Sequence, residues 1–453
     1  MKYYNELARH DGNDTLFEVV EMGIISMLWN IPLHLHAEGL RGTGKTTIMR
    51  AARQIMPPIV RIKDCLYNCD PTSPHCPNHK HLSIEDIAAL GTETVPRPFL
   101  EISHSAKIGT IAGSIDLQKI TNIANPQAAL LPGIIPQANR GVIFIDEINR
   151  LADTSPELTD ILLDVMGTKP GRVQIEETGL PLVELPVQVS VWAASNPDEE
   201  PGPLQEIRRQ LSDRFDLVVE MGRTTSPDAI AEILIQSEQA RLGRNAADKR
   251  TNDQTTRIQR EMESIARKFQ SLSMPDFLRN FIARLYVKYD LESFRAIEAI
   301  QHAALLNCAL RQREQPLVSD ILKVIPLALK HRVDTQTLTK IMNSSDSKPS
   351  GNEGPSLDVS SQQKKKKLET SSSEYSPVAA QGGIENNIPA EAPAEREEKS
   401  LFSPLKNLFT GKTNKQEAET GSDDPIKASP LNKAKRLPDL NLDELVKSEG
   451  DFK

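Results

Sequence analysis

A glycine-rich segment at residues 39–47, with the sequence GLRGTGKTT, combines residue types that bind phosphate. Its glycines allow successive backbone N–H groups to curve around phosphate oxygens, and the helix expected after it directs its positive end toward them. Lys45 adds a positive charge near the β- and γ-phosphates, and the Thr46 hydroxyl can ligate Mg²⁺. A strand-like run precedes the segment and a helical pattern follows it, which argues against a chance glycine-rich turn. The predicted nucleotide contacts are Gly39, Gly42, Thr43, Gly44, Lys45, Thr46 and Thr47.

Two carboxylates, Asp146 and Glu147, follow the apolar run GVIFI at residues 141–145. A buried parallel strand would deliver both at its C-terminal end, where such sheets bind ligands. We predict that Asp146, together with Thr46, holds the Mg²⁺ of the nucleotide, and that Glu147 orients and deprotonates an attacking water. A helix-capping pair is the alternative, which the glycine-rich segment at this spacing disfavours.

Three polar residues further along the chain could complete such a site. Asn196 ends the apolar run VWAAS and could sense the γ-phosphate, although an Asn before a Pro also starts turns. Arg214 could form a local salt bridge, or act as an arginine finger toward the nucleotide of a neighbouring subunit. Arg295 begins a helix whose apolar stripe starts at Phe294, and it lies off that stripe, free to point at nucleotide.

A second group of potential ligands lies in a Cys/His loop at residues 64–82: Cys65, Cys69, Cys76 and His79. Thiolates and imidazoles so close in sequence could hold Zn²⁺ in a tetrahedral Cys₃His site. A redox-sensitive cysteine pair and plain surface thiols in a polar loop are the alternatives.

The elements that must position these residues divide the chain into three parts. Residues 1–222 alternate short apolar runs with helical patterns, which predicts an α/β domain with a parallel sheet. Residues 223–340 show helical patterns and no strand pattern. Residues 341–453 are rich in Ser, Pro, Gly, Glu and Lys, with the run KKKK at 364–367, and we expect a disordered tail.

Composition and charge exclude several classes of protein. The net charge of -8 provides no basic surface of the kind nucleic acid requires, so nucleic acid is not an expected partner. The longest apolar segment, residues 22–35, is interrupted by polar residues and proline, so it cannot span a bilayer. The polar N-terminal residues are unlike a signal peptide, and four cysteines do not form a secreted disulfide framework, so we expect a cytoplasmic protein.

In this order the motifs resemble the AAA+ family, and in detail the ATPase subunit of magnesium chelatase. The similar stretches include RGTGKTT, DCLYNCDPTSPHCP, LLPGIIPQANRGVIFIDEINRL at 130–151, SNPDE, LSDRFDL and ALKHRV at 328–333. The resemblance implies an αβα P-loop NTPase sandwich, a helical lid, MgATP as substrate and a hexameric ring with ATP between subunits. By this resemblance, Asn196 is the first sensor residue, which contacts the γ-phosphate. Arg214 is the arginine finger, and Arg295 is the sensor arginine of the lid. It also assigns residues 171–187 to a β-hairpin insertion.

Three functions are compatible with these motifs. The leading one is an ATPase motor subunit that remodels a partner protein, as in chelatases that insert a metal into a tetrapyrrole. The alternative is a MoxR-like chaperone ATPase that matures or metallates another enzyme. Both imply a partner chain with a von Willebrand A domain, which this sequence lacks. A nucleotide-binding scaffold with little hydrolysis is disfavoured by Lys45, Asp146, Glu147 and Arg214.

Overall fold

The computed structural model describes residues 3–115, 130–176, 182–241 and 249–346. Most of the tail expected over 341–453 lies outside the described residues. The part that is described, up to residue 346, belongs to a helix and is treated with the lid below. In the described residues no helix has the length and apolar character needed to cross a membrane.

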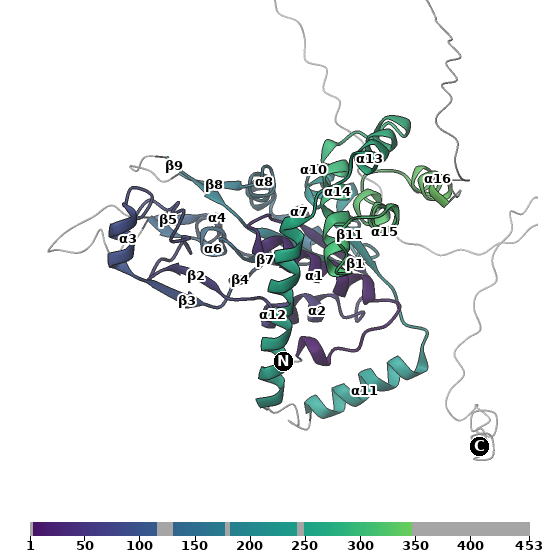
Figure 1. Ribbon diagram of the computed structural model, residues 1–453, viewed down its shortest axis with the longest axis horizontal. Coiled ribbons are helices and arrows are strands. Elements are labelled where there is room, and N and C mark those ends of the chain that lie inside the picture. The colour runs from purple at the N-terminus through teal and green to yellow at the C-terminus, as the bar shows by residue number, and fades with distance from the viewer. Residues whose placement is uncertain (1–2, 116–129, 177–181, 242–248, 347–453) are drawn as a thin grey trace, which may run out of the picture. The chain divides into compact units, whose positions relative to one another are not determined.

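A five-stranded sheet forms the centre of the N-terminal region (Figure 1). All neighbouring strands are parallel, as the sequence predicted. Their order across the sheet is β11 (Leu217–Met221), β1 (Leu35–Gly39), β10 (Ser190–Ser195), β7 (Val142–Asp146) and β4 (Phe99–Ile102). Every residue of β1 and β10 is buried. The VWAA run of β10 is accordingly continuously apolar, whereas β1 also buries His36 and Glu38.

Side chains from the two faces of the sheet enter two separate apolar cores. Phe144 and Trp192 contribute to one core, whereas Ile143 and Val191, one residue away in each strand, contribute to the other. Both faces are therefore covered, and the predicted αβα sandwich is confirmed. The flanking helices are η1 (Tyr4–Glu6), α1 (Asp14–Leu28), α2 (Lys45–Ala51), η2 (Ala52–Gln54), α4 (Ile108–Ile111), α6 (Ile134–Gln137), α7 (Ile148–Thr154), α8 (Pro156–Val165), α9 (Leu204–Ile207) and α10 (Arg209–Arg214).

Three small antiparallel sheets are inserted between the main strands, at the left of Figure 1. β2 (Ile59–Ile62) pairs with β3 (Thr92–Val95), and the chain between them holds the Cys/His loop and α3 (Ile84–Leu90). β5 (Gly113–Ile115) pairs with β6 (Leu130–Pro132). β8 (Gly171–Ile175) pairs with β9 (Val183–Val187), at the position that the resemblance assigns to a hairpin. Glu176, directly after β8, is exposed.

In the described part of the chain after β11, every element is a helix: α11 (Pro227–Arg241), α12 (Lys249–Ser271), α13 (Asp276–Lys288), α14 (Phe294–Leu310), α15 (Val318–Leu329) and α16 (Thr335–Asp346). The expected boundary at residue 340 is wrong, because α16 continues to Asp346 and buries Ile341 completely. In the stripe expected on α14, Ile300, Ala304 and Cys308 are fully buried, whereas Phe294 is 66 % exposed. Ala296, Ala299 and Ala303 are also buried, because small side chains let α14 pack closely on its neighbours.

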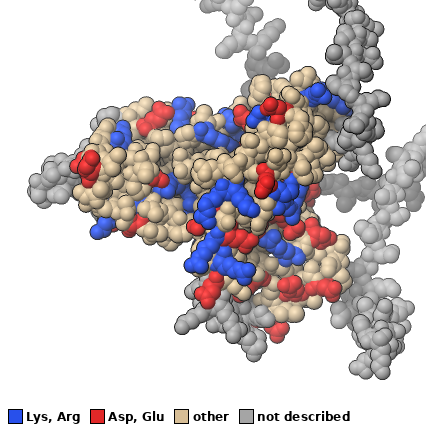
Figure 2. Space-filling model, viewed as in Figure 1, with Lys and Arg blue, Asp and Glu red and all other residues tan. Residues whose placement is uncertain are grey.

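Charged side chains of both signs are exposed on the face shown in Figure 2. Blue and red groups lie beside each other where α12 crosses this face, and its sequence carries Arg257 and Arg260 next to Glu261 and Glu263. Alternating signs are typical of a solvated helix face and do not form the continuous basic stripe that nucleic-acid binding needs.

Candidate functional site

A cleft of about 310 Å³ lies at the carboxyl ends of β1, β10 and β7. Because β10 lies between β1 and β7, the loop after β1 and the carboxylates after β7 reach the same edge of the sheet. Residues around the cleft are Arg41, Gly42, Gly44, Lys45, Thr46, Thr47, Asp146, Glu147, Asn149, Arg150, Ser195, Asn196, Glu199 and Glu200. Most of the predicted site residues are therefore brought together.

The glycine-rich loop has the backbone conformation that its sequence predicts. Gly42 and Gly44 have φ angles of +78° and +91°, in the left-handed region that glycine adopts without steric cost. Gly39 ends β1, where a Cβ atom would lie 2.7 Å from the carbonyl oxygen of Met221. Gly39 and Thr43 do not line the cleft. The Thr43 hydroxyl closes the loop by donating to the Leu40 carbonyl at 2.9 Å.

Lys45 is held inside the loop by backbone carbonyls. Its Nζ donates to the oxygens of Gly39 at 2.6 Å and Leu40 at 2.8 Å. Burial lowers the pKa of Lys45, and the carboxylate of Asp146 opposes that shift. Carbonyl oxygens are weaker partners for an ammonium than phosphate oxygens, so this cation is placed to bind an anion that enters the cleft.

Thr46 and Asp146 meet across the cleft. The Thr46 hydroxyl donates to Oδ1 of Asp146 at 3.2 Å, although the two residues are 100 positions apart in sequence. A hydroxyl and a carboxylate are the hard oxygen donors that Mg²⁺ prefers when it also binds phosphate. The donor set therefore fits the Mg²⁺ of a bound nucleoside triphosphate.

Glu147 adopts a backbone conformation that is uncommon for its residue type. Its φ angle is +55°, a left-handed value that costs a non-glycine residue about 1–2 kcal/mol and is found mainly at functional sites. It stands before α7, yet its side chain makes no capping hydrogen bond and pairs with Arg150 at 2.9 Å. This geometry contradicts the helix-capping interpretation of Glu147.

Arg50 is a contact of the site that the sequence analysis missed. It bonds Glu101 with nitrogen–oxygen distances of 2.8–3.1 Å and lies 3.5 Å from Oδ2 of Asp146. The hydrogen bonds to Glu101 raise the pKa of Arg50, so it keeps its charge beside Asp146. Its position four residues after Thr46 on α2 was the available signal, because residues at that spacing share a helix face.

Asn196 lines the cleft and also organises the turn after β10. Its Oδ1 accepts from the backbone N–H of Asp198 at 3.3 Å, and its Nδ2 donates to Glu199, which in turn pairs with Arg41. Asn149 donates from Nδ2 to the Asn196 carbonyl at 3.3 Å. The turn-forming and cleft-lining interpretations of Asn196 are thus both compatible with its position. Arg41, Asn149, Arg150 and Glu199 carried no distinguishing sequence pattern.

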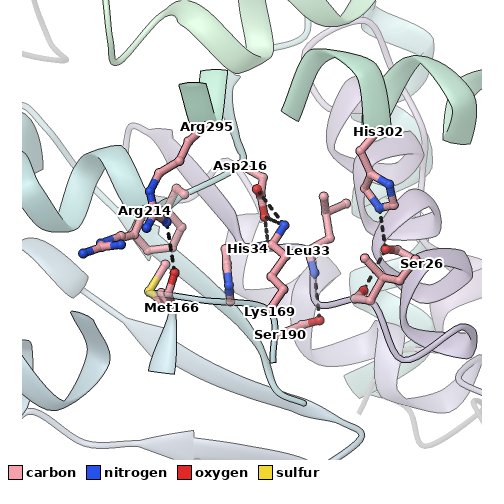
Figure 3. Close-up of polar contacts among 12 residues, drawn as sticks. Ser26, Leu33, His34, Met166, Lys169, Ser190, Arg214, Asp216, Arg295 and His302 are labelled. Atoms are coloured by element: carbon pink, nitrogen blue, oxygen red, sulfur yellow. Dashed lines mark hydrogen bonds and ion pairs between the residues drawn. The ribbon is translucent and has the colours of Figure 1, made fainter. Parts of the chain in front are cut away.

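Arg214 and Arg295 lie together and away from this cleft. Arg214 donates to the Gly167 carbonyl at 3.3 Å, and Arg295 donates to the same oxygen at 2.6 Å and to that of Met166 at 3.2 Å. Figure 3 shows the two side chains beside each other near Met166. They line a separate cavity of about 810 Å³ next to β8 and β9. No ion pair of Arg214 is found among the described residues, so its geometry does not support the local salt bridge.

Arg214 and Arg295 lie at the amino-terminal ends of the parallel strands, whereas the cleft lies at their carboxyl ends. Arg214 precedes β11, whereas the glycine-rich loop follows β1, and these two strands are parallel neighbours in register. The five residues of β11 span about 16 Å, and this strand length separates Arg214 from the end of the sheet where the cleft lies. Burial lowers the pKa of Arg214, with the Arg295 charge as the next cause. Neither guanidinium forms an ion pair with a carboxylate in the part of the chain that the structure describes.

The Cys/His loop also brings its predicted ligands together. The donor atoms of Cys65, Cys69, Cys76 and His79 all lie within 4.8 Å of one another. The three cysteines are 3 % exposed or less, so the interpretation as surface thiols is wrong. No disulfide links them.

Comparisons with known proteins agree with this architecture. A family model described as the AAA lid domain matches residues 279–350. The magnesium-chelatase 38 kDa subunit of Acidiphilium rubrum is 29 % identical over 302 residues, 66 % of this chain and 82 % of that protein. The magnesium-chelatase 38 kDa subunit of Chlorobaculum parvum is 28 % identical over 305 residues, 67 % of this chain and 84 % of that protein.

A third relative, the magnesium-chelatase subunit ChlI of Mesostigma viride, is 28 % identical over 308 residues, 67 % of this chain and 81 % of that protein. A crystal structure of a Cytophaga hutchinsonii protein matches with a TM-score of 0.47 and 17 % identity, over 76 % of this chain and 90 % of that chain. This structural likeness is too weak to carry an argument about function.

Proposed function

We propose, from the premise that this chain is an AAA+ protein similar to the magnesium-chelatase subunits, that it is an ATPase motor that works as a ring. The observation that carries the proposal is the contact between Thr46 and Asp146 at 3.2 Å. It joins the phosphate-binding loop to the strand-end carboxylates, which is the arrangement that MgATP needs.

Each residue of the cleft has a separate role in ATP hydrolysis. Lys45 binds the β- and γ-phosphate oxygens, while Thr46 and Asp146 hold Mg²⁺, which neutralises phosphate charge when bound. Glu147 accepts the proton of the attacking water, and release from its ion pair with Arg150 frees the carboxylate for that role. Asn196 orients the γ-phosphate or the water from the end of β10.

Arg214 and Arg295 act on the nucleotide of a neighbouring subunit. They lie about one strand length from the cleft of their own chain, so their charge is best used across a subunit boundary. Head-to-tail contacts that close give a ring, and the implied stoichiometry is a hexamer. The 3.3 Å and 2.6 Å bonds to Gly167 hold the pair in place until the neighbour's triphosphate arrives.

The ring remodels a partner protein that carries a von Willebrand A domain. The relatives' names suggest magnesium chelation as the client reaction, and we propose a tetrapyrrole as the acceptor of the metal. Maturation of another metalloenzyme, as in MoxR-like chaperones, uses the same ATPase. Identification by mass spectrometry of the chain retained by the Glu147→Gln protein in ATP would separate the two clients.

Assembly and turnover test the proposal together. With MgATP, mass photometry of the full-length protein should show a species of six 50.2 kDa chains, about 300 kDa, and phosphate release should rise steeply with protein concentration. The Lys45→Ala protein should release no phosphate above background. A monomer in saturating MgATP whose turnover does not depend on concentration would contradict the ring.

A further inference from the structure

A compact group of four donor atoms lies in the loop between β2 and α3, outside the nucleotide cleft. Sγ of Cys65, Cys69 and Cys76 and a ring nitrogen of His79 all lie within 4.8 Å of one another. Four ligands arranged as a tetrahedron around Zn²⁺ at about 2.3 Å would lie about 3.8 Å apart. Closing this group around an ion therefore requires shifts of about 1 Å or less.

Hydrogen bonds position the sulfur atoms at this place. The backbone N–H groups of His75 and Cys76 both donate to Sγ of Cys69 at 3.4 Å. Nδ1 of His75 lies 3.3 Å from the same sulfur, Sγ of Cys69. Nδ1 of His79 lies 3.2 Å from Sγ of Cys76. N–H donors around ligand sulfurs orient metal-binding cysteines.

Apolar packing alone does not account for this arrangement. Buried cysteines often behave as small apolar side chains, and Cys65, Cys69 and Cys76 do pack with residues of an apolar core. Apolar packing does not require, however, that the three thiols and the His79 imidazole converge on one point. A metal ion satisfies all four at once, and three thiolates with one imidazole are typical of Zn²⁺.

The loop is tied to the segment that leads into β7. Asn68 donates from Nδ2 to the Gln137 carbonyl at 2.6 Å, Asn139 donates to the Tyr67 carbonyl at 3.4 Å, and Asp70 pairs with Arg140 at 3.0 Å. β7 starts two residues after Arg140 and ends at Asp146. An ion that closes the loop would thus support the strand that carries the catalytic carboxylates.

We propose that Cys65, Cys69, Cys76 and His79 bind one structural Zn²⁺, which fixes the loop against residues 137–140. All four protein ligands close the coordination sphere, so the ion takes no part in hydrolysis. The backbone N–H of His75 donates to Sγ of Cys69, and the His75 side chain is not one of the four proposed ligands.

Metal content of the full-length protein tests the site. Protein purified without chelator from zinc-supplemented cells should contain about one zinc per chain by elemental mass spectrometry, and Cys76→Ser should reduce this to about one tenth or less. Cys308→Ser, a matched change of another buried cysteine, and Lys45→Ala, which disables the nucleotide cleft, should both keep the full zinc content.

Cobalt substitution keeps the test valid if Cys76→Ser fails to fold. Loading with Co²⁺ under reducing conditions should give the tetrahedral d–d absorption and thiolate charge-transfer bands of an S₃N site. The His79→Cys protein should retain the metal with a spectrum shifted toward that of an S₄ site. Little zinc together with no cobalt–thiolate spectrum would overturn the proposal, as would a disulfide among the three cysteines in protein kept reduced.

Discussion

The Glu147→Gln protein should bind ATP with nearly unchanged affinity and hydrolyse it about 10² to 10⁴ times more slowly than the unaltered protein. The amide keeps the size of the side chain but cannot accept a proton from water. The strained φ angle of +55° at Glu147 holds the side chain at the cleft in both proteins, so nucleotide contacts should persist.

Phosphate release under saturating MgATP, together with binding of a fluorescent ATP analogue, measures the two effects separately. Glu157→Gln is the matched control, because Glu157 is an exposed glutamate in the first turn of α8 and lies outside the cleft. Turnover of Glu147→Gln within about threefold of the unaltered protein would remove Glu147 from the proposed role.

The second large effect is expected at Arg214. Arg214→Ala should lower turnover by about 10³ or more while ATP binding stays intact, since the guanidinium serves a neighbouring subunit's nucleotide. Arg209→Ala on the same helix is the matched control, because Arg209 is exposed and pairs with Glu292 at 2.6 Å. It should leave turnover near the unaltered level.

Mixing two inactive proteins shows whether Arg214 acts across the subunit boundary. In an equal mixture of Arg214→Ala and Lys45→Ala chains, about one quarter of the sites combine an intact Lys45 with a neighbour's intact Arg214. Phosphate release should therefore recover to a sizeable fraction of the unaltered rate. A mixture that stays as inactive as its components, under conditions where subunits exchange, would place Arg214 in the site of its own chain.

Sequence motifs predicted many of the residues that line the cleft, because the pattern that identifies them is local. Glycines that permit positive φ, a lysine and a threonine occupy adjacent positions, and strand-end carboxylates follow one apolar run. The convergence of Thr46 and Asp146 followed from the rule that parallel strands direct their carboxyl ends to one edge. The sheet and the helical lid were predicted for similar reasons, from the alternation of apolar runs with helical patterns.

Contacts between distant segments were not predictable from these motifs. The pairing of Arg50 with Glu101 depends on β4 lying next to β7, which no local pattern indicates. The exposure of Phe294 arises because alanines face the core on α14, and alanine is a weak apolar signal. The burial of the three cysteines depends on packing with residues such as Ile87, so a polar loop sequence suggested surface thiols.

Magnesium-dependent ATP binding is the most direct test of the account. Calorimetric titration of the unaltered protein with ATP should show affinity at least about tenfold higher with Mg²⁺ than with excess chelator. Asp146→Asn should lose most of that difference, because the carboxylate that holds the ion is gone. Equal affinity with and without Mg²⁺ in the unaltered protein would show that the phosphate loop and the strand-end carboxylates do not act on one nucleotide.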